Sequence, residues 1–164
     1  MLILGNPDTF SILIETIDEW NEDDTFNNGL LFFSIGGLLF PNKVFSATLS
    51  YELSNLVEQL EGVTMNRELY SMPSKEAFVH FYNKTFPCDS EQENDYSFDI
   101  TPSIFSDNNY FVFAVSNGEF VRVLASELQY NTNSLRHVLE EFSLNEVIIP
   151  QDELSKIILK LKSF

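Results

Sequence analysis

Residues 30–41 read LLFFSIGGLLFP, two apolar runs joined by a pair of glycines. Gly36 and Gly37 can adopt the positive φ angles that a two-residue β-turn needs, so this stretch predicts a β-hairpin. Pro41 has no backbone N–H to donate, and it therefore ends the second strand. Antiparallel pairing is thus the expected starting point of the fold.

A second hairpin is predicted farther along the chain. Residues 110–115 form a six-residue apolar run, which is followed by Ser-Asn-Gly and then by a second strand segment, Phe120 to Leu124. Because both faces of the first strand are apolar, we expect that strand to be central in its sheet. Alternating residues 10–17 predict one more strand, and residues 44–49 predict another.

Helices are expected between these strands, where apolar residues recur at a spacing of three and four. The four predicted helices lie between Ser50 and Gly62, from Ser74 to Tyr82, over 135–142, and from Pro150 to Leu161. Strand pairs that alternate with isolated helices indicate the α+β class. We expect one domain over residues 1–164, with a largely antiparallel sheet built from hairpins and about four helices packed on it.

The net charge is the strongest feature of the composition. Nine Lys and Arg against 25 Asp and Glu give a net charge of −16. Direct nucleic-acid binding is therefore not expected, because phosphate contacts need clustered cations. An excess of this size also destabilises the compact state by self-repulsion, so a functional reason for it is expected. A basic protein partner is the simplest one.

Cysteine usage and hydropathy set the expected compartment. Cys88 is the one cysteine, so no internal disulfide can form. Residues 1–8 have no basic region and an apolar run of only four residues, which is not typical of a secretory signal. The longest weakly polar stretch, 30–40, is far shorter than the ~20 residues that span a bilayer. We expect a cytoplasmic protein with no membrane contact.

Patterns of catalysis and cofactor binding are missing from the sequence. It contains no nucleophile elbow, P-loop, dinucleotide fingerprint or H-E-x-x-H motif. His80 and His137 fall on different predicted helices, off the apolar stripes, and Cys88 is a lone thiol that could act as a nucleophile only with a histidine beside it in space. The acidic segment 21–29 does not match the ligand spacing of an EF-hand calcium loop, whether the loop begins at Asp23 or at Asp24. We therefore expect no enzyme activity, no cofactor and no metal site.

Two long segments carry negative charge without any cation, one before Lys43 and one over residues 85–121. Both also contain aromatic residues, which can anchor a protein interface. A solvated loop surface is the alternative interpretation. The residues that we predict to contact a basic partner are Glu15, Asp18, Glu19, Trp20, Asp23, Asp24, Asp89, Glu91, Glu93, Asp95 and Tyr96.

Short motifs in the first third of the chain point to a family. They are Gly5-Asn6-Pro7, Glu19-Trp20, Asn28-Gly29-Leu30 and residues 36–41, GGLLFP. Their order and spacing resemble bacterial immunity proteins of the immunity protein 42 family, which are found beside polymorphic or contact-dependent growth-inhibition toxins. The resemblance implies a cytoplasmic protein that binds and neutralises a cognate toxin domain and has no catalytic residues.

The leading hypothesis is therefore an immunity protein that binds a basic toxin domain, a nuclease above all, through an acidic surface bearing aromatic residues. Two alternatives stay open. One is a non-catalytic adaptor or regulatory module that binds another basic cellular protein. The other is a small hydrolase or metal-dependent enzyme that uses the acidic loops.

Overall fold

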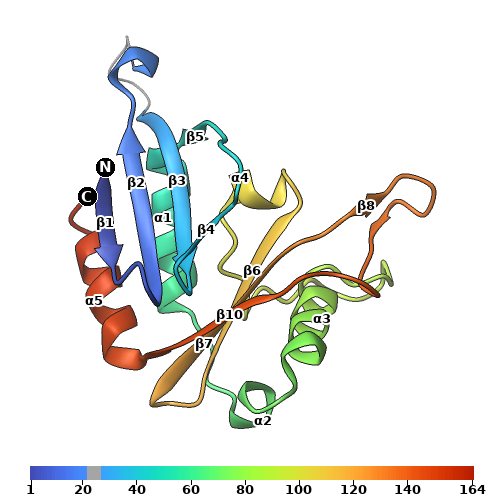
Figure 1. Ribbon diagram of the computed structural model, residues 1–164. Coiled ribbons are helices and arrows are strands. Elements are labelled where there is room, and N and C mark those ends of the chain that lie inside the picture. Colours follow the sequence, from blue (N-terminus) through green and yellow to red (C-terminus); the bar gives the residue numbers. More distant parts are fainter. Residues whose placement is uncertain (22–26) are drawn as a thin grey trace.

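The computed structural model describes residues 1–21 and 27–164, which form two larger antiparallel sheets flanked by helices and a third sheet of two short strands (Figure 1). In chain order the elements are β1 (Leu2–Gly5), β2 (Phe10–Thr16), the 3-10 helix η1 (Asp18–Trp20), β3 (Asn28–Ile35), β4 (Leu38–Phe40), β5 (Ala47–Thr48), α1 (Leu49–Glu61), α2 (Arg67–Tyr70), α3 (Ser74–Thr85), α4 (Ser103–Ser106), β6 (Tyr110–Ser116), β7 (Phe120–Glu127), β8 (Tyr130–Asn131), β9 (Arg136–His137), β10 (Asn145–Pro150) and α5 (Gln151–Leu161). The predicted α+β class is confirmed.

The first sheet has the strand order β1-β2-β3-β4, and β5 pairs with the far end of β3. The predicted hairpin is present: β3 and β4 pair in antiparallel register, with Phe33 opposite Phe40 and Ile35 opposite Leu38. Gly36 and Gly37 have φ angles of 60° and 81°, as the tight turn requires. This leaves β4 as a short edge strand of the sheet.

The second sheet has the order β10-β7-β6. The predicted hairpin of β6 and β7 is confirmed, but β6 lies at the edge and β7 is central, so the expected position of the first strand is wrong. Every residue of β6 is buried because both faces of this sheet are covered. Met65 and Asp99 add single bridges to the outer edge of β6.

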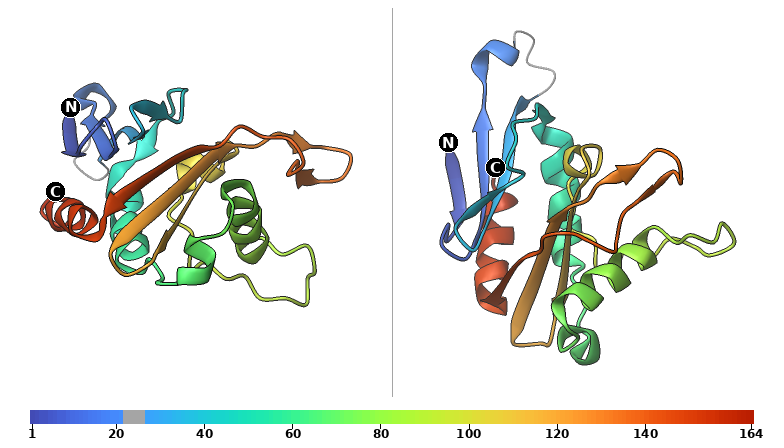
Figure 2. Two further views of the ribbon diagram at one scale, coloured as in Figure 1. Left: turned by 60° about the horizontal axis from the view of Figure 1, so that its bottom comes forward. Right: turned by 45° about the vertical axis from the view of Figure 1, so that its right-hand side comes forward.

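Two apolar cores explain that burial. The larger core lies between the first sheet, helices α1 and α5, and one face of the second sheet. The smaller core lies between the other face of the second sheet and α3, where Phe78 and Phe81 pack on Phe113. Figures 1 and 2 show α1 and α5 on one face of the first sheet and α3 beyond the second. The second sheet therefore connects the two halves of the molecule.

The helix predicted over 135–142 is wrong. Tyr130 and Asn131 pair with His137 and Arg136, so this part of the chain forms the small β8–β9 hairpin, which projects as an arm (Figure 1). Leu135 has a positive φ of 56°, which a right-handed helix excludes. The strand predicted over 44–49 shrinks to β5, because Leu49 already belongs to α1.

Candidate functional site

The first acidic segment lies where β2 ends and η1 begins. Asp18 and Glu19 are exposed on η1, and the indole of Trp20 is 44% exposed, so Trp20 is a surface residue and not part of either core. Glu15, at the end of β2, pairs with the N-terminal ammonium group. Asp23 and Asp24, also predicted to contact a partner, lie outside the described residues.

Asparagine side chains hold this segment in place. The amide of Asn21 donates to the carbonyl oxygens of Ile17 and Asn28, at 2.7 and 2.9 Å. Its oxygen accepts the backbone N–H of Asn28 at 2.6 Å, and the Asn28 amide donates to the carbonyl of Trp20 at 3.2 Å. The start of β3 is thereby tied to η1, which fixes where Asp18, Glu19 and Trp20 emerge.

The second acidic segment is the loop after α3. Asp89, Glu91 and Glu93 are exposed, and the ring of Tyr96 is 59% exposed. The carboxylate of Asp89 accepts the backbone N–H of Glu91 at 2.9 Å, which turns the chain locally. The loop thus presents three carboxylates and one phenol to solvent.

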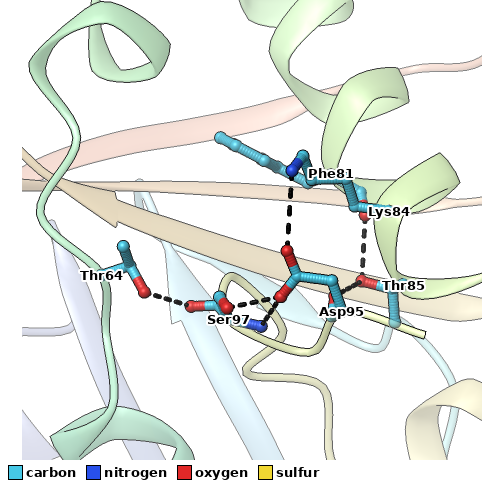
Figure 3. A network of polar contacts seen from close by, with 6 residues as sticks. All are labelled: Thr64, Phe81, Lys84, Thr85, Asp95 and Ser97. Atoms are coloured by element: carbon cyan, nitrogen blue, oxygen red, sulfur yellow. Dashed lines mark hydrogen bonds and ion pairs between the residues drawn. The ribbon is translucent and has the colours of Figure 1, made fainter. Parts of the chain in front are cut away.

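Asp95 differs from its neighbours because its carboxylate is engaged within the protein (Figure 3). It accepts hydrogen bonds from the hydroxyl and the backbone N–H of Ser97, and its other oxygen lies 3.6 Å from the Lys84 ammonium. These Ser97 bonds, followed by Lys84, lower the pKa of the Asp95 carboxyl from its ordinary value. Thr64 also donates to the Ser97 carbonyl at 3.0 Å. Asp95 therefore shapes the loop that carries the other carboxylates.

The two acidic segments do not meet. Figures 1 and 2 place η1 beyond one end of the first sheet and the 89–96 loop beyond the far end of α3, on the other side of the molecule. The predicted contact residues therefore form two separate surfaces.

A groove of about 1460 Å³, which the sequence did not predict, is lined by residues of neither acidic segment. One wall is β4 and the residues that follow it, and the other is formed by the segments around Tyr130 and Glu140. Leu38 and Leu39 are both more than half exposed beside it, at 60% and 53%. Two consecutive leucines in one strand are a usable signal for this groove, because alternation leaves at least one of them outside the core.

His137 is hydrogen-bonded on both ring nitrogens. The Tyr82 hydroxyl lies 2.6 Å from Nδ1 of His137, and Nε2 lies 2.8 Å from the side-chain oxygen of Asn109. Burial lowers the pKa of His137 and raises the pKa of Tyr82 to about 12, so both are neutral near pH 7. His80 lies on α3, as predicted, and Cys88 is exposed.

Among residues 1–21 and 27–164, no group of three or more His, Cys, Asp or Glu is placed to hold a metal ion. In the same residues, no helix has the length and apolar character needed to cross a bilayer.

Comparison with known proteins identifies the fold and the family. No curated protein matches the sequence. The structure resembles the crystal structure of CdiI from Burkholderia dolosa AUO158 with a TM-score of 0.77 and 22% identity, over 99% of each chain, which shows a shared fold. The family model of immunity protein 42 matches residues 1–164. The chain therefore belongs to the immunity protein 42 family.

Proposed function

We propose that this immunity protein binds a basic nuclease toxin domain and blocks it by occupancy, without catalysis of its own. The exposed carboxylates on the two acidic segments attract the toxin, and Trp20 or Tyr96 anchors it. The observation that carries the proposal is the pairing of an exposed aromatic ring with two or three exposed carboxylates on each segment.

The ion pairs within the chain support this role for the exposed carboxylates. At least five of the nine Lys and Arg side chains already pair with carboxylates of this chain. Asp18, Glu19, Asp89, Glu91 and Glu93 have no cationic partner among the described residues. They are therefore free to pair with a cation on another protein.

A nuclease is the class of toxin that fits this surface best. Nucleases bind phosphates through clustered Lys and Arg, so their clefts are basic. Complementary charge can raise association rates from ~10⁵–10⁶ to ~10⁸–10⁹ M⁻¹s⁻¹ at low salt. Fast capture matters for an inhibitor that must act before its target cuts nucleic acid.

Interface size limits how the two segments can act. A standard interface covers roughly 800 Å² of each partner. The accessible surface here is 9099 Å², so such an interface covers less than a tenth of it. Because the segments lie on opposite sides of the molecule, we expect one at most to touch the toxin and the other to contribute through its field.

The test uses the C-terminal domain encoded by the gene directly upstream of this one. We expect the domain to bind this chain one to one, to degrade nucleic acid when alone, and to lose that activity in the complex. Binding of this domain to the variants D18N/E19Q and D89N/E91Q/E93Q is compared with its binding to E58Q/E68Q. This control variant neutralises exposed carboxylates on α1 and α2. Absence of binding, or an upstream domain that is not a nuclease, contradicts the corresponding part of the proposal.

A further inference from the structure

We infer that the toxin docks in the groove beside β4, and that the groove receives an apolar segment of the toxin flanked by Lys or Arg. This inference rests on the proposed function and moves the docking site from the acidic segments to the groove, so that the segments act through their field and neither Trp20 nor Tyr96 is the anchor. The groove is built from two walls that belong to different sheets, β4 of the first sheet and the segments after β7 of the second. It is the place where side chains of both halves of the molecule face the same space.

The walls expose more apolar surface than a free protein needs. Leu38, Leu39 and Val44 are 60%, 53% and 68% exposed on one wall, and Tyr130 is 46% exposed on the other. Single exposed apolar residues are ordinary, but several around one concavity mark an interaction site. Aromatic and aliphatic side chains at the centre of an interface carry most of its binding energy.

Contacts join the two walls of the groove at its base. The Lys43 ammonium lies 3.0 Å from the Glu127 carboxylate, which joins the two walls. The Tyr110 hydroxyl donates to the side chain of Asn42 at 2.7 Å, and the ring of Phe40 packs edge-on against Tyr110 at 5.2 Å. A preformed site loses less conformational entropy on binding. The exposed leucines therefore sit on a wall whose base is already fixed.

The free charge of the groove is negative. Its lining carries three carboxylates, those of Glu127, Glu140 and Glu141, against two cations: Lys43 pairs with Glu127, and Lys75, whose ammonium lies 5.5 Å from the ring centroid of Phe142, keeps its charge. Glu140 and Glu141 line the same groove, are exposed, and have no cationic partner among the described residues. A partner that places Lys or Arg beside its apolar segment therefore gains two charge pairs here.

The same charge argues against a second copy of this chain as the occupant. Two copies would each bring a net charge of −16 and would set unpaired glutamates near each other. Like charges facing across an interface cost several kcal/mol. A basic toxin domain has the opposite sign and is the occupant to which the groove is complementary.

The experiment measures binding of the purified upstream C-terminal domain to three double variants and the wild type. L39S/V44S shortens two exposed wall side chains, and E140Q/E141Q removes the free charges. We expect L39S/V44S to weaken binding at least tenfold, mainly through faster dissociation. E140Q/E141Q should slow association and reduce its salt dependence. The control E58Q/E68Q removes the same number of charges outside the groove and should bind within twofold of wild type.

The outcomes separate this inference from the proposed function. If the wild type does not bind the upstream domain, the proposed function fails. If the wild type binds and L39S/V44S binds equally tightly, the function stands and the groove is not the docking site. A wild-type dimer that L39S/V44S converts to a monomer assigns the groove to self-association and also overturns the inference. Thermal unfolding of each variant checks that its fold is intact.

Discussion

Arg122 is a buried cation in an acidic protein, and it fastens three segments together. It is 5% exposed on the central strand β7. Its guanidinium donates to Glu146 at 2.8 Å, to the carbonyls of Tyr70 and Met72 at 2.8 and 2.6 Å, and to the Ser74 hydroxyl at 2.8 Å. It thereby joins β10 and the α2–α3 connection to the second sheet.

Replacing Arg122 by Ala should therefore cost about 1–3 kcal/mol of the free energy of unfolding, because the carbonyls of Tyr70 and Met72 lose this donor and Glu146 loses its cation. R122K should lose less but still be destabilised, since an ammonium group cannot reproduce the planar fork. Urea unfolding followed by circular dichroism measures both. K156A removes an exposed pair with Asp152 and should leave the midpoint unchanged. If the urea midpoint of R122A equals that of wild type, these contacts do not stabilise the protein in solution.

Glu52 places a carboxyl group inside the protein on α1. It is 5% exposed, and its oxygens accept the backbone N–H groups of Ser103 and Ile104 at 2.8 and 3.0 Å, at the start of α4. Burial is the largest influence and raises the pKa of Glu52 above its ordinary value of 4.5. The protonated form is thus favoured by folding.

The pH dependence of stability follows from that direction. The contribution of Glu52 is fully present below pH 4.5 and is lost as the pH rises through the pKa of the folded state. We expect the free energy of unfolding of wild type, relative to E52Q, to fall as the pH increases from 4 to 7. The exposed E58Q is the control and should follow the wild-type profile. If the free energy of unfolding of wild type instead rises relative to that of E52Q as the pH increases, the two N–H bonds outweigh burial.

At the scale of elements, the side chain of His137 helps to fasten the β8–β9 arm to the second core. In the neutral tautomer that both contacts require, the Tyr82 hydroxyl donates to Nδ1 of His137, and Nε2–H donates to Asn109. Tyr82 comes from α3 and Asn109 from the turn before β6. The arm therefore depends on a side chain whose charge changes near physiological pH.

Acidification should loosen this arm. Burial lowers the pKa of His137 below its ordinary 6.5, so its contribution is present above pH 6.5 and is lost as the pH falls through the pKa of the folded state. Hydrogen–deuterium exchange of residues 129–139, corrected for intrinsic rates, should quicken between pH 7.5 and 5. Y82F should show roughly fivefold faster exchange at pH 7.5 already, equivalent to about 1 kcal/mol for the lost bond. H80Q should match wild type, and an unchanged Y82F would remove the role given to this bond.

The same arm shows where local pattern stops predicting structure. Leu135, Val138, Leu139 and Phe142 have helical spacing, yet the chain there is extended or turned. Leu139 and Phe142 do pack on the second core, so their apolar character was informative about burial and not about conformation. By contrast, the hairpins of β3–β4 and β6–β7 were predictable because Gly36, Gly37 and Gly118 set their turns locally. Strand β10 pairs with β7 although seventeen residues, 128–144, separate them, and no turn signal marks the pairing.

The candidate site was predictable to a lesser extent than the fold. Cation-free stretches in the sequence correctly identified exposed carboxylates such as Asp18 and Glu91, because charge is rarely buried without a partner. Sequence distance could not show that these residues lie on opposite sides of the molecule. It also could not show that Val44 and Tyr130 face one groove, since that proximity arises only when the two sheets pack together.

At the scale of the whole molecule, the excess negative charge acts in opposite directions on stability and on binding. Repulsion within a net charge of −16 destabilises the folded chain, while the same charge attracts a basic partner. Both effects weaken as the Debye length falls from ~30 Å at 0.01 M salt to ~8 Å at 0.15 M. Added salt should therefore stabilise the isolated chain over the range in which it weakens the complex.

We expect the melting temperature of the isolated chain to rise by at least about 2–4 °C between 0.01 and 0.15 M NaCl, which corresponds to about 1 kcal/mol for a chain of this size. Differential scanning calorimetry measures it. Choline chloride at equal ionic strength should give the same rise, because screening depends on ionic strength and not on the identity of the cation. A rise with Na⁺ alone would indicate a specific ion site. A melting temperature that falls with both salts would mean that the internal ion pairs outweigh the repulsion. The charge excess would then not destabilise the folded chain.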